Sequence, residues 1–342
     1  MKADTAVSAP LCIIAVVLLA VVAWFASSVF APLATALFVM ALVWPFQEAL
    51  QTRMPQLAAL ALTLLFTLAV AFVFGSLVIW AVGRVGRSIM MDAARYELMY
   101  QSAADWLDGQ GISIAGMWAE HFDSRWMITA ARYFGGRVQT TMVFWIIVVT
   151  YLLLGLLEVG DFRRKIAAME NREAARVLLD GSRIIASKYR RYLKVRTMMS
   201  ALTGLLVWAF ARIVGLPHAN EWGIIAFALN YLPFIGPFFA TLLPTMVAMT
   251  TFETWQAVIL VFIGLNVIQF IVGSYIEPMV AGNALSVSPT LVLFVIFFWT
   301  FMWGLLGTLL AMPITVAILT FCDQHPRSRW VARLLGSAQE PD

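Results

Sequence analysis

The chain has 342 residues, of which 62% are hydrophobic and only 12% are charged, and its formal net charge is +4. A soluble protein carries about a quarter charged residues, so this composition excludes a soluble globular protein. The apolar residues run continuously instead of alternating, which also excludes a membrane β-barrel. We therefore expect an all-α polytopic membrane protein with about eight transmembrane segments, two of them broken or re-entrant, plus amphipathic surface helices.

Residues 1–83 are expected to hold the first three membrane spans. Residues 5–47 contain no charged side chain and would be about 64 Å long as one helix, against a hydrocarbon core of about 30 Å. Pro32 is the natural break between spans near 11–30 and 32–47, and Pro45 helps to end the second span. A third uncharged span follows over about 57–82.

Residues 84–137 differ in character, because six Arg are balanced by six acidic residues and aromatic residues lie between them. We expect an extramembrane or interfacial segment of amphipathic helices, interrupted at Gly109 and Gly111. Residues 138–157 then form a fourth span.

Residues 158–196 are the most basic part of the chain, with eleven basic and five acidic residues. Apolar residues recur there at helical spacing, so we expect an amphipathic helix lying on the cytoplasmic membrane surface. Nucleic-acid binding is disfavoured, because a segment between two spans already faces anionic lipid. A fifth span follows over 197–216.

The stretch over 222–252 holds no charged residue and is too long for one straight helix through a membrane. Pro233 and Pro237 each remove a backbone donor, and Gly236 permits backbone angles closed to other residues. We expect two half-helices that meet at an unwound turn carrying Asn230. Such a break is a candidate transport site, since unpaired backbone is tolerated at membrane depth only in protein or beside water. A Pro-kinked structural helix is the alternative.

The next span, over 254–276, carries polar residues at helical spacing. Asn266, Gln269, Gly273 and Glu277 are spaced 3, 4 and 4 apart, which puts them on one helix face. That face should point at protein or water. Glu277 is either a membrane-depth carboxylate able to bind a proton or a cation, or a residue at the headgroup level, where Pro278 ends the helix.

The region over 278–322 is again uncharged and too long for one span. We expect an irregular start, a helix from Pro289 to about Trp303, a turn around Gly304 to Gly307, and a second helix that contains Pro313. The core over 197–322 thus holds two Pro/Gly-broken elements, and residues 323–342 form a cytoplasmic tail.

The distribution of Lys and Arg predicts the orientation. It places 158–196, the tail and, by span parity, the N-terminus in the cytoplasm, and 84–137 outside. The two broken elements then either cross once each or re-enter from opposite sides. Re-entry is favoured by an echo between the Gly236 break and the Gly304 break, each followed by Thr-Leu-Leu and a Pro, which suggests an inverted repeat.

Three stretches resemble the sequence signatures of one transporter family. Asn230 to Pro237 (Asn-Tyr-Leu-Pro-Phe-Ile-Gly-Pro) is similar to the first signature of the AI-2E family, Ile276 to Pro289 to the second, and Gly304-x-x-Gly307 with Ala311-x-Pro313 to the third. Leu232 and Phe234 replace the usual Ile and Tyr, and Ala281 interrupts a usual Met-Gly pair.

The resemblance implies an eight-segment helical protein of the bacterial cytoplasmic (inner) membrane that forms a homo-oligomer. Family members are associated with different cargoes, including autoinducer-2 and Na⁺ or Li⁺ exchanged for H⁺.

We therefore predict a secondary transporter or exporter of a small molecule or ion in the lipid bilayer. The path is expected to be lined by Asn230, Pro233, Gly236, Pro237, Asn266, Gln269, Glu277, Pro278, Gly304, Gly307 and Pro313. A Na⁺(Li⁺)/H⁺ antiporter and a non-transporting membrane scaffold are the alternatives. The sequence contains no phosphate-binding loop, zinc-protease motif or nucleophile elbow, so we expect no enzyme activity, cofactor or metal.

Overall fold

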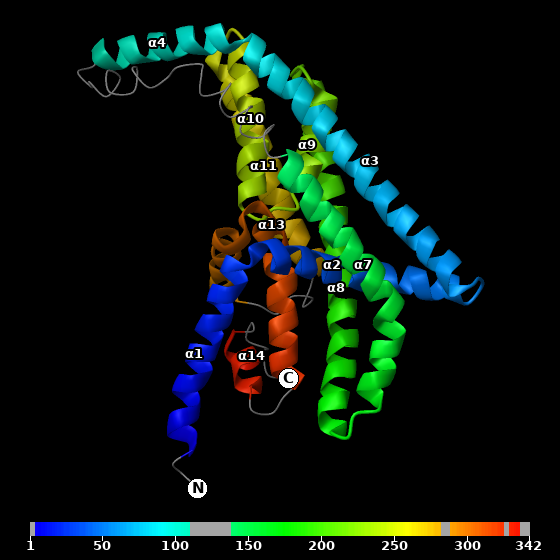
Figure 1. Cartoon of the computed structure of the whole chain (residues 1–342). Coiled ribbons are helices and arrows are strands. Elements are labelled where there is room, and N and C mark those ends of the chain that lie inside the picture. The colour runs from blue at the N-terminus through cyan, green and yellow to red at the C-terminus, as the bar shows by residue number, and fades with distance from the viewer. Residues whose placement is uncertain (1–3, 110–137, 282–287, 325–327, 336–342) are drawn as a thin grey trace. The chain divides into compact units, whose positions relative to one another are not determined.

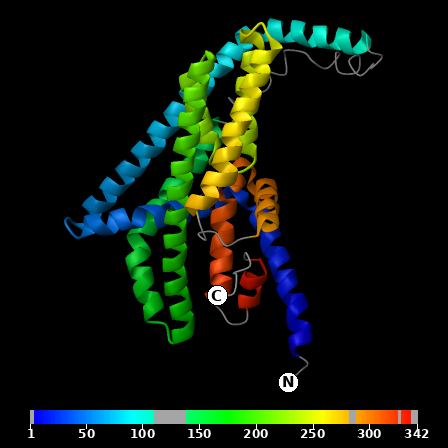
Figure 2. The same cartoon turned by 180° about the vertical axis from the view of Figure 1, so that it is seen from behind.

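The computed structural model describes residues 4–109, 138–281, 288–324 and 328–335, which form helices and short connections with no strand among them (Figures 1 and 2). The chain divides into two compact units. Unit 1 comprises residues 1–67, 143–193 and 282–342, and unit 2 comprises residues 68–142 and 194–281.

The first two helices are divided at a different residue from the one expected. Helix α1 (Asp4–Phe25) ends before Ala26 and α2 (Ser27–Gln51) follows, so that Pro32 and Pro45 both lie inside α2. The expected break at Pro32 and the expected end at Pro45 are therefore wrong. Pro45 has no N–H to donate to the carbonyl of Ala41, four residues earlier. Arg190 Nη1 donates to that carbonyl instead, at 3.2 Å, so α2 continues through the proline.

Helix α3 (Gln56–Met91) is longer than the expected span over 57–82, and it includes Arg84. Helix α4 (Ala93–Gly109) follows and ends where the first glycine interruption was expected, whereas Gly111 lies outside the described residues. Within unit 2, the Tyr96 hydroxyl of α4 donates to the carbonyl of Met246, at 3.2 Å.

The basic segment does not form a separate surface helix. Residues 158–167 belong to α7 (Val138–Ala167), and residues 172–196 continue without interruption into the fifth span as α8 (Arg172–Val214). No Gly or Pro lies between Lys188 and Ser200 to break the helix. Within unit 1, the end of α7 and the start of α8 run side by side in both views, joined by residues 168–171 (Figures 1 and 2).

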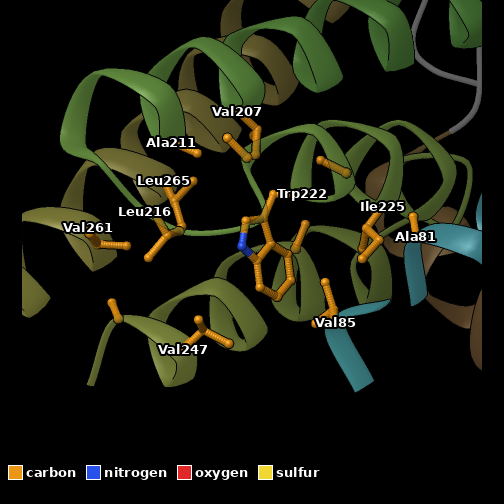
Figure 3. Close-up of a cluster of buried hydrophobic side chains, with 14 residues drawn as sticks. Ala81, Val85, Val207, Ala211, Leu216, Trp222, Ile225, Val247, Val261 and Leu265 are labelled. Atoms are coloured by element: carbon orange, nitrogen blue, oxygen red, sulfur yellow. The ribbon is translucent and has the colours of Figure 1, made fainter. Parts of the chain in front are cut away.

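The stretch over 222–252 does break into two half-helices. Helix α9 (Ala219–Leu229) and α10 (Ile235–Thr251) are joined by a turn that carries Asn230, as expected. Trp222, near the start of α9, packs in one cluster with Val247, near the end of α10, which shows that the chain folds back as a hairpin (Figure 3). Trp222 is almost fully buried, so this cluster anchors the hairpin in unit 2.

The following helix also departs from expectation at its end. Helix α11 (Trp255–Phe270) passes through a π-helical segment, η1 (Ile271–Ile276), into α12 (Glu277–Ala281). Pro278 lies inside α12 instead of ending the helix. The wide π turn before it eases the clash that a proline ring makes with the preceding turn of an α-helix.

Unit 1 contains the second broken element, α13 (Pro289–Gln324), which is followed by α14 (Arg329–Leu335). Its backbone leaves the helical region at Trp303 and at Gly304, where φ is 62°. The expected turn thus begins where the sequence placed it, while the irregular stretch over 282–287, including Gly282, lies outside the described residues.

The two breaks share one local contact. A Cβ on Gly236 would lie 1.9 Å from the carbonyl oxygen of Leu229, and a Cβ on Gly307 would lie 1.8 Å from that of Trp299. In each case the first turn after the break presses on the last carbonyl groups before it. The structural counterpart of Gly236 is therefore Gly307 and not Gly304, so the Thr-Leu-Leu echo is out of register with the geometry.

Six of the described helices are long and apolar enough to cross a membrane: Ser27–Gln51, Gln56–Met91, Met142–Ala167, Arg172–Val214, Trp255–Val280 and Thr290–Gln324. Large apolar side chains such as Leu65, Phe72 and Ile79 on α3 are mostly exposed, which suits a lipid-facing surface. The multi-pass helical class is thereby supported, and the number of about eight segments stays a prediction.

The close approach of Gly236 and Gly307 to backbone carbonyl groups predicts that a larger residue at either position lowers the stability of the protein. Gly236→Ala and Gly307→Ala should each lower the free energy of unfolding by about 2 kcal/mol or more, because the new methyl group meets rigid backbone. Gly75→Ala on α3 is the matched control, since nothing lies within 4 Å of its added Cβ. Thermal unfolding of the purified protein in detergent measures the effect. Equal midpoints for all three variants would contradict it.

Candidate functional site

The site in unit 2 begins with a polar stripe on one face of α8. Arg196, Ser200 and Thr203 are spaced four and three residues apart, which places them on the same side of the helix. All three residues are buried. Buried polar groups need hydrogen-bonding partners, so this face must meet other polar groups of the protein.

The turn of the α9–α10 hairpin supplies two of those contacts. The amide of Asn230 donates to Ser200 Oγ at 3.2 Å, and the hydroxyl of Tyr231 hydrogen-bonds to Thr197 Oγ1 at 2.9 Å. Two consecutive residues of the turn are thus tied to two neighbouring residues of α8. The break that Pro233 and the glycine impose is held at a fixed place against the polar stripe.

An ion pair completes the site. Arg196 Nη1 lies 2.6 Å from Glu277 Oε1, and the side chains are 9% and 26% exposed, respectively. A short, charge-assisted contact of this kind is among the stronger hydrogen bonds in proteins. Since the pair is mostly out of water, removing either partner leaves a poorly solvated charge.

Glu277 reaches Arg196 from the far side of the π segment. A π turn adds about one residue per turn to the helix, so it rotates everything after it relative to α11. Asn266 and Gln269, on α11, therefore do not continue directly into Glu277 as one polar face. Asn266 is exposed, and its amide donates to the carbonyl of Phe262 on its own helix, at 2.8 Å. Gln269 is half-buried, and Gly273 lies within the π segment.

Three aromatic rings stand next to the polar contacts. Phe74, Phe227 and Tyr231 form a mutual edge-to-face cluster, with ring centroids 5.6 to 6.2 Å apart. Tyr231 belongs to both sets, because its hydroxyl bonds to Thr197 while its ring packs on the two Phe residues. The site thus has a charged, hydrogen-bonding side and an aromatic side.

A second ion pair lies elsewhere in unit 2 and has a different setting. Arg84 Nη1 lies 3.0 Å from Glu221 Oε1, and the side chains are 48% and 4% exposed, respectively. Glu221 is in the first turn of α9, where a carboxylate also favours the helix N-terminus. This pair fixes the start of the hairpin next to the buried Trp222.

The remaining predicted residues fall into two groups. Pro233 and Pro237 flank Gly236 at the hairpin turn and are half-buried, while Pro278 is exposed on α12. Gly304, Gly307 and Pro313 belong to unit 1. The carbonyl of Pro313 accepts a hydrogen bond from the Tyr189 hydroxyl at 2.8 Å, and the hydroxyls of Thr300 and Thr308 pair across the Gly304 break at 2.7 Å.

The sequence analysis missed several residues of this site. Arg196 was counted with the basic surface segment, and Thr197, Ser200 and Tyr231 were not singled out. A signal was present in the sequence, because Arg196, Ser200 and Thr203 follow helical spacing where a basic stretch enters an apolar one. Their pairing with Asn230 and Glu277 depends on the tertiary fold and leaves no pattern in the sequence.

Comparisons with known proteins show that this sequence is similar to those of transporters. The sequence profile of a family described as AI-2E family transporter matches residues 13–327. The AI-2 transport protein TqsA of Escherichia coli K12 is 25% identical over 318 residues, 91% of this chain and 90% of the relative. A putative transport protein of Borreliella burgdorferi is 28% identical over 56% of this chain and 54% of its own length. The putative transport protein YhhT of Escherichia coli K12 is 30% identical over 145 residues, which are 42% of this chain and 41% of the relative.

The ion pair predicts a strong coupling between its two side chains. Arg196→Gln and Glu277→Gln should each destabilise the protein by about 3–5 kcal/mol, because each leaves an uncompensated buried charge. The double variant should lose clearly less stability than the sum of the losses in the two single variants.

Thermal or chemical unfolding of the purified variants measures this cycle. The exposed pair Arg164–Asp161 is the control, since its coupling should stay below about 1 kcal/mol. Strictly additive effects at Arg196 and Glu277 would show that the pair carries no net interaction.

Proposed function

Because this chain belongs to the AI-2E family of transporters, we propose that it is a secondary transporter that moves a small polar solute across the bacterial cytoplasmic membrane. The observation that carries the proposal is the Arg196–Glu277 pair, buried in unit 2 beside the turn of a broken helical hairpin. The solute path of the proposal runs along the polar stripe of α8 and the turn at Asn230.

The physical cost of the arrangement supports this assignment. A buried ion pair is at best weakly stabilising compared with well-packed apolar residues. Polar and charged residues inside apolar segments are expensive and mark pathways for solutes or ions. Packing alone would favour aliphatic side chains at Arg196 and Glu277, so a functional reason for them is the simpler account.

We further propose that the α9–α10 hairpin re-enters the membrane and does not cross it. Helix α9 is about 16 Å long, roughly half the thickness of the hydrocarbon core. The chain then reverses at Asn230, so its two ends return to the same side. Paired broken helices near the midplane are a common way to build a transport site.

Autoinducer-2 is the proposed solute, on the strength of the likeness to TqsA over nearly the full length of both chains. A small, oxygen-rich molecule also suits a site of amide, hydroxyl and guanidinium groups. The proposal includes the other residues that the sequence predicts along the solute path, in α11 and α13.

A Na⁺(Li⁺)/H⁺ antiporter is less favoured. A bare cation is bound by carboxylate and carbonyl oxygens, and Glu277 is the obvious carboxylate of this site. That carboxylate is already held by the guanidinium of Arg196, which repels a second positive charge. A scaffold without transport activity is the other alternative, and flux measurements separate it from a transporter.

The decisive experiment measures flux of autoinducer-2 in proteoliposomes that contain the purified protein. Wild-type protein should give flux well above protein-free vesicles. The double variant Arg196→Gln/Glu277→Gln should lower that flux by about tenfold or more, because both charged groups of the path are removed while no lone buried charge remains. The variant Arg84→Gln/Glu221→Gln is the matched control and should keep most of the flux.

A Na⁺ gradient and a pH gradient are imposed in parallel vesicles. Cation exchange without autoinducer-2 flux would establish the antiporter in place of our proposal. Absence of both activities in well-folded protein would favour the scaffold.

A further inference from the structure

We propose that the site at Arg196 selects solutes that carry a negatively charged oxygen group, such as a carboxylate, on a small body with an apolar or planar face. The inference rests on the proposed transport function and names a class of solute, so it is independent of whether autoinducer-2 is the molecule carried. It follows from the donors that the site leaves unused, from the orientation of the guanidinium and from the aromatic rings at its side.

The site contains more hydrogen-bond donors than acceptors. A guanidinium has five N–H groups and no acceptor, and the carboxylate of Glu277 engages it through Nη1. The Asn230 amide has two N–H groups and donates one of them to Ser200, so its second N–H adds a further donor to the same cluster. An environment rich in donors is complementary to a ligand rich in acceptors.

Arg196 Nε is the donor that points to the missing ligand. The side chain of Arg196 is only 9% exposed, so Nε is shielded from water. Nε also has no hydrogen-bond partner among the described residues. A buried charged donor without an acceptor is costly, and such atoms call for an explanation. The hydroxyl of Thr203, on the same stripe, is also buried without a partner.

The planar fork of arginine makes the acceptor specific. Besides the edge that meets Glu277, a guanidinium offers a second edge, formed by Nε and one terminal nitrogen. Two parallel donors at fixed spacing match the two oxygens of a carboxylate or of a phosphate. One guanidinium can therefore hold Glu277 and an anionic solute at the same time.

The Nε side of this second guanidinium edge is not accessible to solvent in the structure. Arg196 Nε is covered, whereas Glu277 is partly exposed and Tyr231 is half-buried in the hairpin turn. The turn is held to α8 by the contacts of Asn230 and Tyr231. A solute can therefore reach this donor only after a neighbouring segment moves aside.

The aromatic rings define the rest of the solute. Tyr231 hydrogen-bonds on the polar side and packs against Phe74 and Phe227 on the other, so a ligand at Arg196 lies next to ring surfaces. Aromatic side chains favour apolar or planar groups and contribute little to the binding of a small hydrated ion. An organic anion fits both sides of the site better than an inorganic one.

Binding of benzoate to the full chain in phosphatidylcholine nanodiscs tests the inference. Benzamide is the neutral isostere and should bind about tenfold more weakly or worse, since it cannot accept a charge-assisted pair of bonds. The double variant Arg196→Gln/Glu277→Gln should lose benzoate binding by a similar factor. The variant Arg84→Gln/Glu221→Gln, at the other ion pair, should retain it within about twofold.

A second variant covers the case in which the double variant does not fold. Arg196→Lys keeps the positive charge opposite Glu277 but removes the planar Nε edge, so it should preserve the unfolding temperature and still weaken benzoate binding. Equal binding of benzoate and benzamide, or unchanged benzoate binding in Arg196→Lys, would overturn the inference.

Nanodiscs that contain phosphatidylglycerol distinguish a lipid headgroup from a free solute. Benzoate affinity that is unchanged in anionic nanodiscs supports a free organic anion, whereas competition by the lipid would overturn that assignment. Discrimination between benzoate and benzamide without flux in proteoliposomes would refute the transport function and leave the ligand class standing. Flux of autoinducer-2 without such discrimination would do the reverse.

Discussion

The scarcity of water governs the organisation of unit 2. In an apolar environment every charge and every unpaired backbone group needs a partner inside the protein, and the cost of leaving one alone is several kcal/mol. Arg196 and Glu277 meet this constraint through each other, and the unwound turn meets it through Asn230 and Tyr231. Helix α8 carries the partners of all these groups.

Two elements of the fold accommodate a break in their helix in the same way. At each break a glycine after the turn approaches the last carbonyl groups of the preceding helix more closely than any side chain would permit. This contact shortens the unwound stretch and keeps the hairpin compact. The surroundings of the two breaks nevertheless differ, because the first is tied to α8 by an amide and a hydroxyl and the second by a pair of threonine hydroxyls within α13.

Local chemistry explains which features could be predicted from the sequence. Pro233 and Gly236 act on their own backbone, and long uncharged runs report burial in lipid, so the hairpin break and the helical membrane class were both accessible. Pro45 does not end its helix, because the carbonyl that it leaves unpaired accepts a hydrogen bond from Arg190, which is far away in the sequence. The partners of Arg196 were inaccessible for a similar reason. Charge counting assigned it to a surface, whereas its setting depends on residues 81 positions away.

The π segment before Glu277 has a consequence for how the chain tolerates length changes. The π turn holds about one residue more than an α-helical turn, so removing one residue between Ile271 and Ile276 would restore α-helical winding and leave the following residues facing nearly the same way. The carboxylate of Glu277 would therefore still face the guanidinium of Arg196. Helix α11 has no such spare residue, so one residue inserted there would rotate Glu277 by about 100° away from Arg196. The site therefore tolerates the loss of a residue in the π segment better than an insertion before it.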